Sequence, residues 1–304
     1  MSFLRPRDIF MNSRRITIIT VVTLVILGVF SAERLQAEEL PAVEKYGDRI
    51  VVTKDIPYAK DGQPWQKLDL YMPRGNGPFP VVVCWFGGGF TGGNKGGMAR
   101  VCAFMADKGI AAAAPGYFLA VPKEDKRAWP RNVQDAKCAV RFLRANAATY
   151  HIDGDRIAGL GHSSGAYLAL MVGLTPGLKD LEGNDGWADQ SSRLKAIVNI
   201  AGVSDRRGGL GTGTLYLLGK GYEDKLDLRT LASPIAHIGK DSPPVYTLHG
   251  EEDKTVVPDS AKKLNDALQA AGVDHELHLM PKLGHNPINV QTLEEVRAWL
   301  LKRL

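Results

Sequence analysis

Apolar strand-like runs alternate with helical segments along most of the chain, and this alternation limits the possible folds more than any other feature. Residues 50–53 and 68–72 read as an opening antiparallel pair of strands. Strands are then predicted at 80–86, 110–115, 156–160, 196–200, 245–248 and 275–280, and helices at 98–108, 132–150, 165–174, 258–271 and 290–304. This order requires an α/β fold, with a mostly parallel central sheet and helices on both faces.

One stretch interrupts the alternation. Residues 203–243 are rich in glycine and show weak periodicity. We therefore expect a small insertion over the carboxyl edge of the sheet, acting as a cap or lid. The predicted domain spans residues 38–304, and 203–243 belong to it as the insertion.

The first 37 residues have the pattern of an export signal. Arg14 and Arg15 precede an apolar stretch at 16–30, and small residues follow it, which predicts a signal peptide cleaved after Ala37. The alternative is an uncleaved N-terminal anchor in the inner membrane, with residues 16–32 as the tether. Both interpretations predict an exported protein. Cleavage would leave it periplasmic or secreted, and an uncleaved anchor would hold it at the inner membrane.

Charge and cysteine content exclude several other classes. The net charge is +5, but five arginines against two acidic residues give residues 1–37 a charge of +3, which leaves +2 for the rest. No basic stripe remains, so no nucleic-acid partner is expected. Cys84, Cys102 and Cys138 lack metal-type spacing and read as small buried hydrophobes, with one disulfide as the alternative. No metal-binding or nucleotide-binding motif is present, so no metal or cofactor is expected, and the oligomeric state stays open.

Residues 161–165, Gly-His-Ser-Ser-Gly, lie between a buried strand and an apolar helix. In this context G-x-S-x-G predicts a nucleophile elbow, a tight turn that holds the serine above the sheet edge at a helix N-terminus. Ser163 has glycine two positions away on both sides and Ser164 does not, so Ser163 is the candidate nucleophile. The backbone N–H of Ser164 is a candidate donor to an oxyanion.

A nucleophilic serine needs a base, and the base needs an orienting acid. Among the histidines after the elbow, His285 is expected in a loop beyond the last strand, where a base can reach Ser163. The others lie in strands, at a strand end or in the insertion: His237, His249, His275 and His278. Asp253, in the turn after the preceding strand, is the predicted acid. Glu251 and Glu252 are its rivals.

A second oxyanion donor is expected from the loop after the strand at 80–86. Residues 86–90 read Phe-Gly-Gly-Gly-Phe, and glycine lets a backbone N–H approach a substrate oxygen without interference from a Cβ. Gly87 and Gly88 are the candidates, and the residues alone do not choose between them. Five aromatic residues could line a pocket, although ordinary packing is the more common role: Trp65, Phe90, Trp129, Trp187 and Tyr216.

With these motifs the chain resembles the α/β-hydrolase superfamily, and within it the bacterial esterase/lipase group with an H-G-G-G oxyanion motif, including members like acetyl-xylan and feruloyl esterases. The resemblance covers roughly residues 50–300. The matching features are the glycine loop at 85–95, Tyr117, 132–146, 152–157, the elbow, 232–234, 249–255 and Gly284-His285. It implies Ser163 as nucleophile, Asp253 as acid and His285 as base.

The chain departs from that group at two positions. Phe86 stands where the oxyanion motif usually has histidine, and the elbow reads Ser-Ser-Gly-Ala where Ser-Ala-Gly-Gly is usual. The resemblance implies a serine carboxylic-ester hydrolase that works through an acyl-enzyme on short-acyl or aromatic-acyl esters, such as acetylated or feruloylated carbohydrate. The alternatives are a peptidase similar to prolyl oligopeptidase and a non-catalytic binding protein of the same fold.

Overall fold

A computed structural model describes residues 38–208 and 211–304, so the predicted signal or anchor at 1–37 lies outside the described residues. Among the helices in these two ranges, none combines the length and the apolar character needed to cross a bilayer. Export of the protein therefore stays a prediction.

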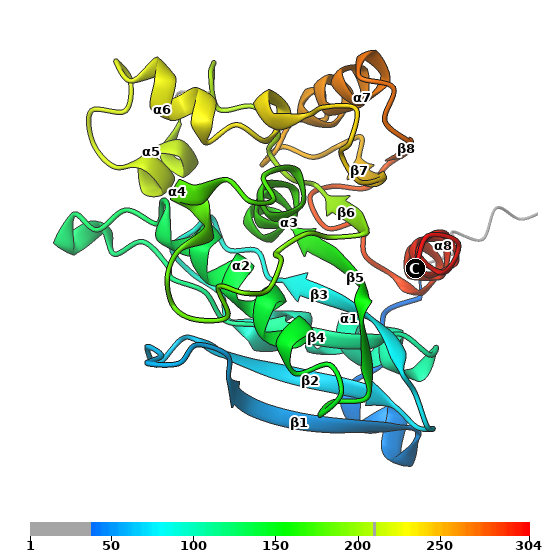
Figure 1. Cartoon of the computed structure of the whole chain (residues 1–304). Coiled ribbons are helices and arrows are strands. Elements are labelled where there is room, and N and C mark those ends of the chain that lie inside the picture. The colour runs from blue at the N-terminus through cyan, green and yellow to red at the C-terminus, as the bar shows by residue number, and fades with distance from the viewer. Residues whose placement is uncertain (1–37, 209–210) are drawn as a thin grey trace, which may run out of the picture. The chain divides into compact units, whose positions relative to one another are not determined.

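Eight strands form one sheet in the order β1-β2-β4-β3-β5-β6-β7-β8 (Figure 1). The strand β2 pairs antiparallel with β1 and β4, and all other neighbours are parallel. The strands are β1 (Ile50–Pro57), β2 (Lys67–Pro73), β3 (Phe79–Trp85), β4 (Ala111–Pro115), β5 (Ile152–His162), β6 (Ala196–Ile200), β7 (Val245–Gly250) and β8 (His275–Met280). The mostly parallel α/β fold predicted from the sequence is confirmed.

Helices cover the two faces of the sheet. In Figure 1, α2 and α3 lie on one face and α1 and α8 on the other. The main helices are α1 (Ala99–Asp107), α2 (Arg131–Ala145), α3 (Ser164–Leu174), α7 (Asp259–Ala270) and α8 (Val290–Leu301). Because both faces are covered, β4 and β6 are buried along their whole length, which explains their continuous apolar sequence.

The strands β1 and β5 are longer than predicted, and two helices also differ from the prediction. The helix expected at 132–150 ends at Ala145, and the side-chain amide of the next residue, Asn146, donates to the carbonyl of Phe142 at 2.8 Å. The short helix α4 (Lys179–Glu182) was not expected. Within 203–243 the described residues form α5 (Thr212–Leu218), α6 (Leu226–Leu231) and the 3₁₀ turn η4 (Pro234–His237). The role of this stretch as a cap stays a prediction.

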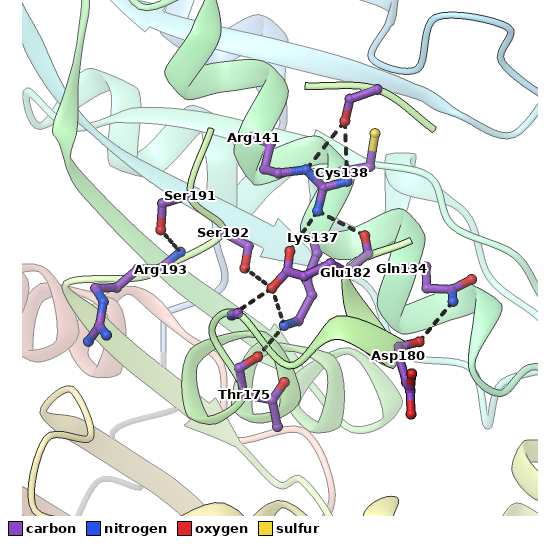
Figure 2. Close-up of polar contacts among 12 residues, drawn as sticks. Gln134, Lys137, Cys138, Arg141, Thr175, Asp180, Glu182, Ser191, Ser192 and Arg193 are labelled. Atoms are coloured by element: carbon purple, nitrogen blue, oxygen red, sulfur yellow. Dashed lines mark hydrogen bonds and ion pairs between the residues drawn. The ribbon is translucent and has the colours of Figure 1, made fainter. Parts of the chain in front are cut away.

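Helix α4 is attached to the core by a buried ionic network (Figure 2). The carboxylate of Glu182 accepts hydrogen bonds from Lys137 at 2.8 Å and Arg141 at 2.7 Å, both on α2. It also accepts from Ser192 at 2.7 Å, and the Lys137 ammonium donates to the carbonyl of Thr175 as well. Burial raises the pKa of Glu182, but Lys137, Ser192 and the backbone N–H of Gly177 together outweigh burial and leave the pKa below its ordinary value.

All three cysteines are buried and free. Their prediction as small core residues is confirmed, and the alternative of a disulfide is not realised in this structure.

Candidate active site

Residues 161–165 make the tight turn that their sequence predicts. The strand β5 ends at His162 and α3 begins at Ser164, so Ser163 occupies the corner with φ 57° and ψ −120°. Such a backbone conformation costs a non-glycine residue roughly 1–3 kcal/mol. A Cβ at Gly161 would lie 2.1 Å from the carbonyl oxygen of Gly165, and one at Gly165 would lie 2.0 Å from that of Trp85. Both glycines are therefore required by close backbone approach.

The structure brings Ser163, His285 and Asp253 together at the carboxyl edge of the sheet. Ser163 Oγ lies 2.9 Å from His285 Nε2, and His285 Nδ1 lies 2.7 Å from Asp253 Oδ2. His285 is in the loop between β8 and α8, and Asp253 follows β7. The rival acids Glu251 and Glu252 are exposed, whereas Asp253 is only 3% exposed. The hydroxyl, imidazole and carboxylate thus form one hydrogen-bonded chain.

Two backbone amides fix the Asp253 carboxylate. Its Oδ1 accepts from the N–H groups of Thr255 at 2.8 Å and Val256 at 3.0 Å, which leaves Oδ2 directed at His285. Burial raises the pKa of Asp253, but the hydrogen bonds from His285 and the two amides lower it by more than burial raises it. The pKa therefore falls below its ordinary value. The group is ionised at neutral pH and stabilises a proton on His285 Nδ1.

Two further histidines, which were not predicted as site residues, support this arrangement. His162 Nε2 lies 2.8 Å from the carbonyl oxygen of His285, so the elbow holds the backbone of the loop that carries the base. Burial lowers the pKa of His162, which keeps its ring neutral at pH 7. His249 is fully buried, with Nε2 2.7 Å from the carbonyl of Val256 and 3.1 Å from Asp253 Oδ2. The only sequence signal for either role was proximity to the elbow or to the acidic turn.

The glycine loop lies against the elbow, as an oxyanion site requires. A Cβ on Gly87 would be 3.1 Å from both Ser163 Cβ and the ring of His162. Ser164 is the first residue of α3, so its N–H has no acceptor within the helix. Within the described ranges, no hydrogen bond uses the N–H of Gly87 or Gly88 either. The three predicted donors therefore remain available beside the serine, and the choice between Gly87 and Gly88 remains open.

Phe86 and Tyr117 support the glycine loop in a way that the resemblance did not predict. Their rings stack with centroids 4.2 Å apart, and the Tyr117 hydroxyl donates to the carbonyl of Phe86 at 2.7 Å. This contact anchors the residue that stands in place of the usual histidine.

Two pockets meet at Ser163. The first, of about 860 Å³, is lined by Ser164, Phe90 and residues of the 203–243 insertion. The second, of about 940 Å³, is lined by Gly87, Gly88, His162 and His285. Of the five aromatic residues considered from the sequence, Phe90 and Tyr216 line the first pocket, while Trp65, Trp129 and Trp187 line neither.

A hydroxyl with an imidazole on one side and free amides on the other can attack a carbonyl carbon and hold the resulting oxyanion. Together with the strand–serine–helix turn in a mostly parallel sheet, it defines an α/β hydrolase. The sequence model of the BD-FAE family matches residues 68–268, and the chain belongs to this family of α/β-hydrolase esterases.

Curated relatives agree with this assignment. The "Probable carboxylic ester hydrolase LipM" of Mycobacterium tuberculosis is 30% identical over 233 residues, which is 71% of this chain and 51% of that protein. The "Isoprenylcysteine alpha-carbonyl methylesterase ICME" of Arabidopsis thaliana is 29% identical over 261 residues, which is 79% of this chain and 58% of that protein. The chain spans about half the length of such relatives.

Solved structures show the same fold. A bifunctional GH43-CE protein of Bacteroides eggerthii matches with a TM-score of 0.76 and 32% identity, covering 83% of this chain and 35% of that chain. A thermophilic esterase of Thermogutta terrifontis, solved with butyrate bound, matches with a TM-score of 0.68 and 26% identity, covering 83% of this chain and 94% of that chain.

Proposed function

We propose that this protein hydrolyses carboxylic esters through an acyl-enzyme, with Ser163 as the nucleophile, His285 as the general base and Asp253 as the acid that orients it. One observation carries the proposal. Ser163 Oγ lies 2.9 Å from His285 Nε2, within reach for direct proton transfer, and this imidazole has a carboxylate on its other nitrogen. The relatives named as esterases support the same activity.

In the proposed mechanism His285 Nε2 takes the proton of Ser163 as the oxygen attacks the ester carbonyl. The imidazolium that forms is stabilised by the ionised Asp253 at 2.7 Å. The backbone N–H of Ser164 and that of Gly87 or Gly88 donate to the oxyanion. His285 then gives its proton to the leaving alcohol. In the second half of the reaction His285 takes a proton from water as the water attacks the acyl-enzyme, and it returns that proton to Ser163 Oγ as the acid leaves.

Proteins of similar sequence and fold support a substrate class for this proposal. Carbohydrate esters with short or aromatic acyl groups, such as acetylated or feruloylated polysaccharide fragments, are the proposed substrates. The "CE" part of the Bacteroides eggerthii protein and a "carbohydrate esterase from gut microbiota", 24% identical and similar in fold, support this class. Export through residues 1–37 would bring the enzyme to such material, and the N-terminal sequence of the mature protein tests that step.

The activity is tested with Ser163→Ala and an exposed-serine control, Ser191→Ala. The wild type and Ser191→Ala are expected to hydrolyse p-nitrophenyl acetate and to react with a fluorophosphonate, whereas Ser163→Ala does neither while keeping its fold by circular dichroism. Undiminished ester hydrolysis by Ser163→Ala contradicts the assignment. Cleavage of an aminoacyl anilide in preference to esters would identify a peptidase, and no fluorophosphonate labelling of the wild type would identify a binding protein.

A further inference from the structure

Arg206 lines the first pocket beside Ser163, and it is unusual because it is buried there without an acidic partner among the described residues. It follows β6 in the chain, is only 6% exposed, and lines the same pocket as Ser163 and Ser164. Buried arginines are normally paired with a carboxylate, because an uncompensated buried charge is costly. Within residues 38–208 and 211–304, no carboxylate lies at ion-pair distance from this guanidinium.

The guanidinium of Arg206 is held by neutral groups instead. Its Nη1 donates to the hydroxyl of Thr214 at 3.2 Å, and its carbon lies 5.4 Å from the ring centroid of Phe90 and 5.2 Å from that of Tyr167. These cation–π contacts fix its position without neutralising it. Its Nε is buried with no acceptor, and Nη2 makes no hydrogen bond to the described part of the chain. Because Nε is enclosed by the protein, Nη2 is the donor left to bind a ligand.

The other charges of the first pocket are already paired. Asp205 binds the guanidinium of Arg207 at 2.9 Å, and Asp259 binds Lys263 at 2.8 Å. Arg206 is thus the one cation lining this pocket, among the residues that the structure describes, without an anionic partner. Burial lowers its pKa, but an arginine side chain remains protonated at neutral pH. The pocket therefore carries one positive charge that no described residue neutralises.

The position of the base decides which part of an ester enters this pocket. His285 must protonate the leaving alcohol, so the alcohol has to lie on its side of Ser163. His285 lines the second pocket and does not line the first. Ser163 lines both, so the acyl group extends from the reacting carbon into the first pocket, toward Arg206.

We propose that Arg206 is a specificity-determining residue that binds an anionic group on the acyl part of the substrate, a carboxylate being the simplest match to the free Nη2 of a charged guanidinium. Among carboxylic esters, the site then prefers those whose acyl group carries a negative charge, such as half-esters of dicarboxylic acids, over the neutral acetyl and feruloyl esters named above. This inference rests on the proposed esterase function, because it assigns the two sides of the ester from the role of His285.

The test compares kcat/KM for monomethyl glutarate and methyl pentanoate, two esters of matched acyl length with and without a terminal carboxylate. Their hydrolysis is monitored by nuclear magnetic resonance. Charge-assisted hydrogen bonds predict a preference of about tenfold to a hundredfold for the anionic ester in the wild type. Arg206→Gln is expected to abolish this preference, and Arg206→Lys to retain part of it. Lys263→Gln removes an exposed, paired cation of the same pocket and is expected to keep the wild-type ratio.

Three outcomes would overturn the inference. The first is a higher kcat/KM of the wild type for methyl pentanoate than for monomethyl glutarate. The second is an unchanged ratio of the two values in folded Arg206→Gln. The third is a higher kcat/KM of the wild type for the pentanoate ester of glycolic acid, whose charge is on the alcohol side, than for monomethyl glutarate. If Arg206→Gln does not fold, competitive inhibition of the wild type by glutarate and pentanoate replaces it, with glutarate expected to bind at least tenfold more tightly. Equal inhibition by both overturns the inference. The wild type's hydrolysis of p-nitrophenyl acetate tests the esterase function separately.

Discussion

Replacing Asp253 with asparagine should disable the site by trapping the wrong tautomer of His285. The N–H groups of Thr255 and Val256 both donate to Oδ1, at 2.8 and 3.0 Å. In Asp253→Asn they hold the amide oxygen at that position, so the amide NH₂ takes the place of Oδ2 and faces His285 Nδ1. That nitrogen must then accept a hydrogen bond, which puts the ring proton on Nε2. An Nε2 that carries a proton cannot remove the proton of Ser163.

The expected loss in kcat for Asp253→Asn is about 10⁴-fold, or about 5.5 kcal/mol of transition-state stabilisation. The assay is p-nitrophenyl acetate hydrolysis at pH 7.5 with saturating substrate, and thermal unfolding checks the fold. Glu252→Gln is the matched control, because this exposed carboxylate is one residue away in the same turn. A folded Asp253→Asn variant within tenfold of the wild type would refute the reasoning, as would an equal loss in Glu252→Gln.

Three further predictions concern the oxyanion loop, the ionic network and pH. Gly87→Ala puts a Cβ 3.1 Å from Ser163 Cβ and should lower kcat about a hundredfold; full activity in steady-state assays would contradict the proposed place of the loop. Glu182→Gln leaves two buried cations without their carboxylate, so urea denaturation should show a loss of about 3 kcal/mol that Ser191→Ala does not share; an unchanged midpoint would contradict the account. Because burial lowers the pKa of His162, its contribution to stability is present above the unfolded pKa of about 6.5 and is lost as pH falls toward the folded value. The fall in the free energy of unfolding from pH 7.5 to 5.5 should therefore be smaller in His162→Gln, and equal pH dependence in both proteins would show that His162 is not the cause.

Local sequence patterns predicted the sheet, its main helices and the elbow because each depends on neighbours in the chain. The continuous apolar runs at β3, β4 and β6 indicated strands, and these strands are buried along almost their whole length. Helix α4 could not be predicted, because four residues are too few to show a period. It is attached through Glu182 to partners more than 40 positions away in sequence.

Ser163, Asp253 and His285 could be predicted from their order in the chain and from their positions directly after strands. The carboxyl ends of parallel strands lie at one edge of the sheet, so residues in these positions come together there. The supporting contacts of His162 and His249 depend on backbone carbonyls of other loops, so no sequence pattern marks them. Arg206 was hidden for a different reason. Its stretch shows weak periodicity, and two properties of the described structure distinguish it from an ordinary surface arginine: its burial and the absence of a carboxylate around it.

The central claim is that Ser163 carries the acyl group during turnover, and direct detection of that intermediate tests it. Rapid mixing with p-nitrophenyl butyrate should release a burst of nitrophenol equal to the enzyme concentration, and acid quenching followed by peptide mass spectrometry should find one butyryl group on Ser163. A butyryl group on another residue, or turnover by a Ser163→Ala variant with the same burst, would contradict the account.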